Sequence, residues 1–338
     1  MKTLIKTLCN TAGAGGVMDI ASCISAIVAD YVDEVRVDAL GSVVAVKRCG
    51  KANAPLLLLE AHMDEIGFVV TDVDDGGFIR VANCGGIDRR VLAATEVTVL
   101  TEPPLAGVFC STPPHLSHGD DKIKALDEMG IDVGLPSDVV KETVTKGTRV
   151  VFRANAVEIG ENGICAKALD DRVGCAAVIE AMRLLKGADL SCDVAALFAV
   201  QEEIGGAGAS VAAFAMEPTA AIVTDVSFAA TPDTPSHKCG KLGAGPMLGI
   251  APSLHDGFTS QLKRVASECK IPLQYEVMGG DTGTDADGIV SSRSGVPTAL
   301  VSIPQRYMHT PVELVDVRDV QMVAELMAAV AKEGVVSC

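Results

Sequence analysis

The sequence predicts an α/β protein with a mixed, largely parallel central sheet that is flanked by helices and interrupted by a small inserted all-β barrel domain. From residue 171 onwards, apolar strand-like runs alternate with helical patterns, as in a parallel sheet covered on both faces. Between residues 68 and 157, short β-rich runs are separated by Gly, Pro and Asp turns, which is typical of a barrel or sandwich. The 338 residues also exceed the length of about 250–300 at which single cores stop growing, so we expect two domains.

The elements of the α/β part follow from the spacing of apolar residues. Helical spacing covers residues 2–9 and 17–30, and a continuous apolar run at residues 55–60 suits a fully buried strand. The remaining expected strands are 34–37, 42–47, 193–201, 220–225, 272–277 and 298–303, and the remaining expected helices are 172–185, 208–214, 257–268, 284–292 and 317–332.

The β-rich part lies in the connection that follows the buried run. Its expected strands are 68–72, 78–82, 96–100, 105–110 and 149–152, and the polar segment 117–129 is expected to be a mobile surface loop. The barrel is therefore predicted as an insertion at residues 67–164, which splits a discontinuous α/β domain of residues 1–66 and 165–338.

Composition narrows the class of protein. The 44 acidic and 28 basic side chains give a formal net charge of -16, which argues against nucleic acid as a partner. Eleven cysteines without a CxxC pair indicate reduced thiols and a cytoplasmic protein. Lys6 interrupts the first apolar run, and no later run approaches the roughly 18 apolar residues of a membrane span. We expect neither a signal peptide nor a membrane partner.

Imidazoles and carboxylates stand at the ends of the predicted buried strands. Open α/β sheets bind their ligands at the carboxyl ends of strands, so these side chains could converge on one crevice. Two imidazoles with several carboxylates make a divalent-metal site of N/O type, and burying so many acids without a cation would be very costly. The residues concerned are His62, Asp170, Asp171, Glu202, Glu203, Asp225 and His309.

Six segments carry a resemblance to a known family. They are residues 61–67 (AHMDEIG), 167–174 (KALDDRVG), 200–205 (VQEEIG), 223–226 (VTDV), 283–286 (GTDA) and 304–310 (PQRYMHT). In order and spacing, from residue 55 to 313, they resemble the M42 metallo-aminopeptidases of the glutamyl and tetrahedral aminopeptidase type. This family is related to the co-catalytic zinc peptidases of the M28 and M20 type. The β-rich insertion falls where the family carries its β-barrel domain.

The resemblance implies two divalent metal ions per subunit, zinc in the first place and cobalt or manganese as alternatives. Asp170 would bridge them. His62 and Asp225 would complete one metal's ligands, and Glu203 and His309 the other's.

The resemblance also assigns two catalytic residues in the α/β domain, residues 1–66 and 165–338. Glu202 would be the general base for a water activated by the metals. Asp64 would accept the second ring N–H of His62 and fix its tautomer. The family's peptide bond at the position of Asp170 and Asp171 is cis.

The implied activity is a metallo-aminopeptidase that removes N-terminal residues from short peptides, in a homo-oligomer that could be a tetrahedral dodecamer. One alternative is a hydrolase with the same metal site that acts on a non-peptide amide. A glycoside hydrolase fits less well, because the chain has no Trp for a sugar platform and its acids are assigned to metals. A non-enzymatic paralogue would have lost ligands, whereas all five ligand positions are intact.

Several residues near the motifs have simpler interpretations. Glu202 and Glu203 would face opposite ways in a regular strand, so both roles require that the strand has already ended. The acidic turn at residues 281–287 is expected to cap a helix, with a pocket role as the alternative. His115 and His118 are expected at the surface. Residues 205–209 (GGAGA) replace a Leu-Arg-Gly-Ala type segment of the family, and the missing positive charge argues against a strong glutamyl preference.

Overall fold

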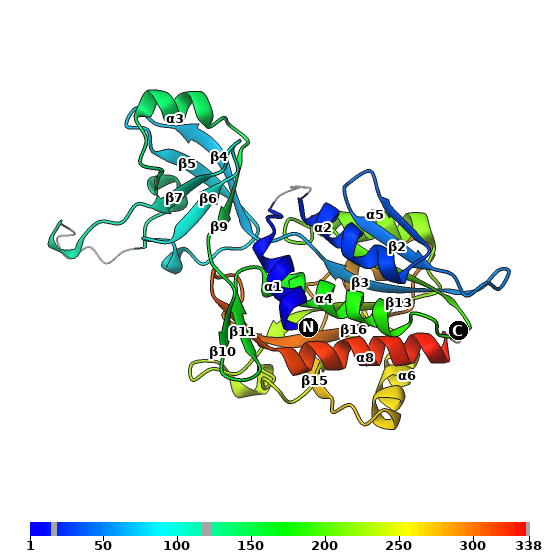
Figure 1. The fold of residues 1–338 in the computed structure, drawn as a ribbon. Helices are drawn as coiled ribbons and strands as arrows, with labels where there is room; N and C mark the ends of the chain where they lie inside the picture. Colours follow the sequence, from blue (N-terminus) through cyan, green and yellow to red (C-terminus); the bar gives the residue numbers. More distant parts are fainter. Residues whose placement is uncertain (15–18, 117–122, 336–338) are drawn as a thin grey trace.

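The computed structural model of the protein describes residues 1–14, 19–116 and 123–335. It consists of an α/β part and a smaller barrel that projects from one side of it (Figure 1). The first two residues of the helix expected at 17–30 and residues 117–122 of the polar segment 117–129, His118 among them, lie outside the described residues.

Within the described residues, eleven strands form one mixed sheet. Its four middle strands, β12, β3, β13 and β16, are parallel, and antiparallel pairs extend it at both edges. The sheet therefore belongs to the predicted class. In spatial order the strands are β1 (Glu34–Val37), β2 (Val43–Lys47), β12 (Asp193–Ala199), β3 (Leu56–His62), β13 (Ala220–Phe228), β16 (Thr298–Arg306), β17 (Glu313–Asp316), β11 (Gly163–Ala166) and β10 (Val157–Ile159), with β14 (Met247–Ile250) and β15 (Gln274–Val277) beside β16.

Helices cover both faces of the sheet because side chains of a buried strand alternate between the faces. On β3, Leu57 and Leu59 belong to the core beneath one set of helices, and Leu58 belongs to the core on the other face. The first set comprises α1 (Lys2–Asn10), α2 (Asp19–Val28), α4 (Leu169–Leu184), α6 (Asp256–Glu268) and α8 (Val317–Glu333). The second set comprises α5 (Ala207–Met216) and α7 (Ala286–Val290).

The inserted part is a closed antiparallel barrel in the order β4-β5-β8-β7-β6-β9. Phe68, Phe109 and Phe152 form its aromatic centre, with edge-on ring contacts of 5.0 and 5.4 Å between centroids. The strands are β4 (Gly67–Val73), β5 (Ile79–Cys84), β6 (Glu96–Val99), β7 (Leu105–Phe109), β8 (Ile131–Asp132) and β9 (Arg149–Phe152), and helix α3 (Ser137–Thr143) packs against them.

The predicted inserted barrel is confirmed as an architecture. β10 and β11, which come after the last barrel strand, pair with the central sheet through β17. The domain boundaries at residues 67 and 164 stay a prediction. In the described part of the chain, no helix is both long enough and apolar enough to cross a membrane.

Candidate metal centre

The carboxyl ends of the middle strands bring the predicted ligand segments to one edge of the sheet. In the pairing of β3 with β12, His62 lies opposite Ala199, so the turn after β12 starts beside this histidine. β13 also runs parallel to β3 and ends past Asp225. Parallel neighbours share their direction, so residues at their ends lie close together although they are far apart in the sequence.

Asp170 lies between the two predicted histidines. Its Oδ1 is 3.0 Å from Nε2 of His62, and its Oδ2 is 3.3 Å from Nε2 of His309. Asp170 is 6% exposed and His62 is 2% exposed. A buried carboxylate with one oxygen toward each imidazole has the orientation that a bridging metal ligand requires.

Two groups of side chains could each hold a metal ion, and Asp170 belongs to both. One group is His62, Asp170 and Asp225, and the other is Asp170, Glu203 and His309. In each group the candidate ligand atoms lie within 4.8 Å of one another. Imidazole nitrogens and carboxylate oxygens are the donors that zinc and similar divalent ions take. Oε1 of Glu203 is also buried without a hydrogen-bond partner among the described residues, so the donor set fits two metals.

The electrostatics of the centre favour cations. Burial raises the pKa of Asp225 well above its usual value, and the charge of Asp170 raises it further. Burial and Asp170 likewise raise the pKa of Glu203 to about 10. Burial opposes protonation of His62, but its contacts with Asp170 and Asp64 raise its pKa overall. The same negative field that raises these pKa values attracts divalent ions.

Asp64 shapes the turn that carries Glu202 and Glu203. Oδ1 and Oδ2 of Asp64 accept the backbone N–H groups of Glu202 and Glu203 at 3.1 and 3.3 Å. Strand β12 has already ended at Ala199, two residues earlier than the predicted strand, and Gln201 has a φ of 66°. Two adjacent glutamates can therefore both line the cavity. Oδ1 of Asp64 also lies 3.5 Å from Nδ1 of His62, on the side that the predicted positioning role requires.

Several residues near the candidate metal centre have a left-handed backbone conformation, with positive φ. Among the described residues, nine non-glycine residues have positive φ. Four of them are a candidate ligand or lie two residues from one: Ala168, Gln201, Tyr307 and His309, with φ values from 55° to 66°. Each such conformation costs about 1–3 kcal/mol and persists only where the surroundings enforce it. The predicted cis peptide between Asp170 and Asp171 is also present.

Glu313 is a residue of the site that the sequence did not reveal. Its side chain is buried, with 1% of the residue exposed. Oε2 accepts the backbone N–H of Asp170 at 3.1 Å, and Oε1 accepts the backbone N–H of His309 at 2.9 Å. One carboxylate therefore joins the main chains of two candidate ligands. Glu313 is the first residue of a four-residue strand, β17, and nothing in the local pattern marks such a contact.

The barrel reaches the metal centre through two glycines after β5. A Cβ atom on Gly85 would lie 3.1 Å from Oε2 of Glu203, and one on Gly86 would lie 3.1 Å from Nδ1 of His309. Gly85 also has a φ of 85°, which side chains rarely tolerate. The insertion therefore closes one side of the site, and larger residues here would press on two candidate ligands.

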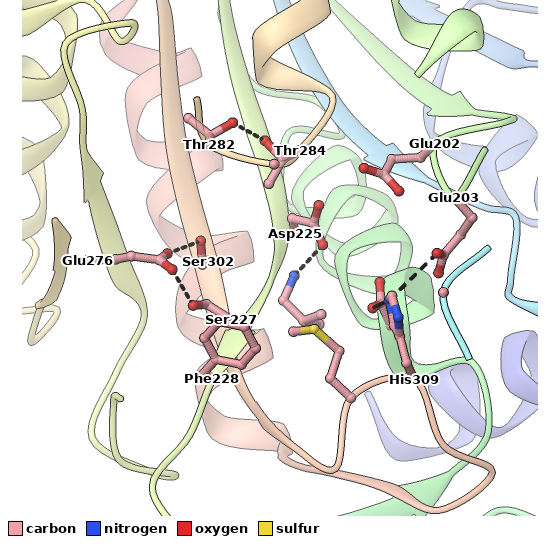
Figure 2. A pocket seen from close by; sticks show the side chains of 15 residues that line it. Glu202, Glu203, Asp225, Ser227, Phe228, Glu276, Thr282, Thr284, Ser302 and His309 are labelled. Carbon is pink, nitrogen blue, oxygen red and sulfur yellow. Dashed lines mark hydrogen bonds and ion pairs between the residues drawn. The ribbon is translucent and has the colours of Figure 1, made fainter. Parts of the chain in front are cut away.

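A cavity of about 340 Å³ opens beside the candidate ligands. Figure 2 shows Glu202, Glu203 and His309 on one side of it, Asp225 in the middle, and Glu276 on the far side. Thr282 and Thr284 of the acidic turn also line it, although Asp64 does not.

The acidic turn at residues 281–287 lines the cavity, but its predicted capping of a helix is not made by a side-chain hydrogen bond. Asp287 accepts the backbone N–H groups of Thr282 and Gly283 at 3.0 Å, so it stabilises the turn before α7. Asp285 is the N-cap residue of α7 but makes no capping hydrogen bond. Its carboxylate is buried, and burial raises its pKa to about 7. His115 is exposed, as expected.

Comparison with known proteins decides the family. A model of the family described as M42 glutamyl aminopeptidase matches residues 41–326, which is most of the chain. The chain belongs to the M42 glutamyl aminopeptidase family. This aminopeptidase is 36% identical to the lysyl aminopeptidase of Pyrococcus furiosus, over 98% of this chain and 96% of that protein.

Solved structures agree with the family in fold. An aminopeptidase from the archaeon Desulfurococcus kamchatkensis is 33% identical and superposes with a TM-score of 0.92, over 98% of this chain and 94% of that one. The TET1 peptidase of Pyrococcus horikoshii, described as able to assemble into a tetrahedron or a large octahedral shell, is 31% identical with a TM-score of 0.87. There the coverage is 98% of this aminopeptidase and 99% of that chain. The similarity therefore includes both the sheet and the barrel.

Proposed function

We propose that the protein is a dinuclear-metal aminopeptidase that removes N-terminal residues from short peptides. The observation that carries this proposal is Asp170, whose two oxygens face His62 and His309 and which belongs to both candidate metal groups. Membership of the M42 family also supports an aminopeptidase activity.

The proposed ligands divide between two metals. His62 and Asp225 would hold one ion, Glu203 and His309 would hold the other, and Asp170 would contribute to both. Zinc suits this set of imidazoles and carboxylates, and cobalt and manganese accept the same donors. When bound, the two ions supply Lewis-acid polarisation of the scissile carbonyl and a lowered pKa for the attacking water.

Glu202 is the proposed general base. Its carboxylate lines the cavity, and burial raises its pKa above the usual value, which makes it a stronger proton acceptor near neutral pH. It accepts a proton from the attacking water and returns it to the leaving amine. Asp64 keeps Glu202 in place through the backbone hydrogen bond and keeps Nδ1 of His62 directed away from the metals.

The proposed assembly is a homo-oligomer in the cytoplasm, with the tetrahedral dodecamer as the form to test. The support is the TET1 peptidase of Pyrococcus horikoshii and its described tetrahedral assembly. Size-exclusion chromatography with light scattering tests this: a mass near twelve times 34.9 kDa supports the dodecamer, and a monomer contradicts it.

Hydrolysis of aminoacyl-p-nitroanilides tests the activity. The protein is stripped with a chelator, reloaded with zinc, cobalt or manganese, and assayed against a panel of N-terminal residues. We expect release of p-nitroaniline only after metal is restored, and none from N-acetylated substrates. If no substrate in the panel is cleaved with any metal, the site must act on a different class of amide.

A further inference from the structure

Glu276 is a carboxylate in the cavity that the proposed chemistry does not use. Five acidic residues line this cavity in the described part of the chain, and four of them belong to the proposed metal centre: Asp170, Glu202, Glu203 and Asp225. The fifth is Glu276, which comes from the short edge strand β15. In Figure 2 it lies across Asp225 from Glu203 and His309.

Two buried serines hold the carboxylate of Glu276. Ser302 donates a hydrogen bond to its Oε2 at 3.0 Å, and Ser227 donates to its Oε1 (Figure 2). Ser227 and Ser302 are 3% and 1% exposed, so their positions are fixed by the sheet. A carboxylate has about four acceptor sites, and these serines use two of them. The remaining sites are free to accept hydrogen bonds from a ligand.

The register of the sheet places this carboxylate close to the metal centre. Ser302 on β16 is paired with Asp225 on β13, and neighbouring strands lie about 4.8 Å apart. Ser227 follows Asp225 by two residues on the same strand, so both side chains leave the same face. A substrate residue whose carbonyl reaches the metals would therefore extend its side chain toward Glu276.

No protein cation neutralises Glu276 in residues 1–14, 19–116 and 123–335, because none of the ion pairs in these residues includes it. Lys238 borders the neighbouring cavity, which Glu276 also lines, but Lys238 is exposed and forms no ion pair with it. A positively charged ligand group that reached this half-buried carboxylate would supply the missing counter-charge.

The lining of the cavity is partly apolar. Phe228 and Met308 line the same cavity. Lysine and arginine have alkyl stems that pack along apolar surface while the charged end contacts a polar group. The cavity therefore offers both a surface for the stem and an anion for the charge.

We propose that Glu276, held by Ser227 and Ser302, forms the subsite for the side chain of an N-terminal lysine or arginine, and so gives the enzyme a preference for basic over acidic residues. This inference rests on the proposed aminopeptidase function. The ammonium or guanidinium donates to the free acceptor sites of Glu276 in a charge-assisted hydrogen bond. An N-terminal glutamate would instead bring a second carboxylate to the same place.

The test compares kcat/KM for Lys-, Arg-, Leu- and Glu-p-nitroanilide in the metal-loaded wild type, Glu276→Gln and Glu276→Lys. Glu142→Gln is the matched control, because Glu142 is exposed on α3 in the barrel. We expect the Lys-to-Leu ratio of kcat/KM to fall about 10- to 100-fold in Glu276→Gln, as for loss of a hydrogen bond to a charged group, and to stay at the wild-type value in the control. Glu276→Lys should raise the Glu-to-Lys ratio above that of the wild type.

The outcomes separate this inference from the proposed function. A Lys-to-Leu ratio that is the same in wild type and Glu276→Gln overturns the subsite. An equal fall of kcat/KM on all four substrates would also leave the Lys-to-Leu ratio unchanged. It would mean that Glu276 contacts the common α-amino group or supports the fold. If the metal-loaded wild type cleaves none of the four substrates, the aminopeptidase proposal itself fails.

Discussion

The backbone N–H of Asp170 donates a hydrogen bond to Oε2 of Glu313 at 3.1 Å. Since the other oxygen of Glu313 accepts the N–H of His309, this buried carboxylate fixes two ligand segments that are distant in the sequence. Its two oxygens face main-chain donors, so it positions the ligands without being one of them.

Replacement of Glu313 by glutamine should therefore weaken metal binding. The amide has one acceptor oxygen, so its NH₂ group would face the backbone N–H of Asp170 or His309 as a second donor. We expect the affinity for zinc to fall about 10- to 100-fold, as for other residues that orient metal ligands. Competition with a chromogenic chelator measures it. Glu325→Gln, on the exposed side of α8, is the control, and equal affinities in both variants would contradict the positioning role.

Removal of the metals should destabilise the folded protein. Without cations, the carboxylate of Asp170 lies within 4.8 Å of those of Asp225 and Glu203. A ligand that binds only the folded state stabilises it by about 2.7 kcal/mol at 100 times its Kd. We expect the Tm to fall by several degrees after chelation and to recover when zinc is added. An unchanged Tm would mean that the candidate ligands do not hold metal.

The loss of stability that metal removal causes should increase with pH. Burial, with the charge of Asp170, raises the pKa of Glu203 to about 10 from 4.5, so the metal-free folded protein binds a proton that the unfolded chain has released. Its stability therefore falls as pH rises through this window. Metals bind the deprotonated ligands, so the Tm gain from zinc should be larger at about pH 8.5 than at about pH 6. Differential scanning fluorimetry measures it, and a gain that shrinks with pH would contradict this account.

Loss of Lys167 should destabilise the α/β part. Nζ of Lys167 lies 2.6 Å from Oε2 of Glu65, and Arg172 lies 3.6 Å from the other oxygen. All three residues are buried. Breaking a buried pair costs about 3–5 kcal/mol, so Lys167→Met should lower the free energy of unfolding by about 3 kcal/mol, since Arg172 remains.

The matched control for Lys167 is an exposed lysine. Lys141→Met removes an ion pair with Asp75 on the barrel surface, which is expected to be worth less than about 1 kcal/mol. Urea unfolding of the metal-loaded proteins measures both changes. Similar effects of the two substitutions would show that burial of the Lys167–Glu65 pair contributes nothing.

The sequence was sufficient for much of the fold and for the segments of the site. Buried parallel strands are continuous apolar runs, so β3, β12, β13 and β16 could be found within a few residues. Polar residues at or after the carboxyl ends of these strands could therefore be expected at one edge of the sheet. The predicted ends were less accurate: the apolar pattern runs through Val200, but β12 ends at Ala199 because the chain turns at Gln201, whose φ is 66°.

Among the described residues, the strands that escaped prediction are short. β8, β10, β11, β14 and β17 have two to four residues each, too few for a period to be visible. Glu313 lies on one of these strands, β17, and Glu276 lies on β15, which was expected as a strand. The roles of both residues depend on contacts with residues distant in the sequence. In the sequence, Gly85 and Gly86 indicate only a turn. In the structure, the absence of a Cβ atom at both positions leaves room for the side chains of Glu203 and His309.

The most direct test of the central claim is the metal content and turnover of Glu202→Gln. The amide keeps the size of the side chain and leaves all five proposed ligands in place, but it cannot accept the proton. We expect two metal ions per chain by mass spectrometry of metals, as in the wild type, and a kcat lower by several orders of magnitude. Full activity with two bound metals would contradict the assignment of Glu202 as the general base.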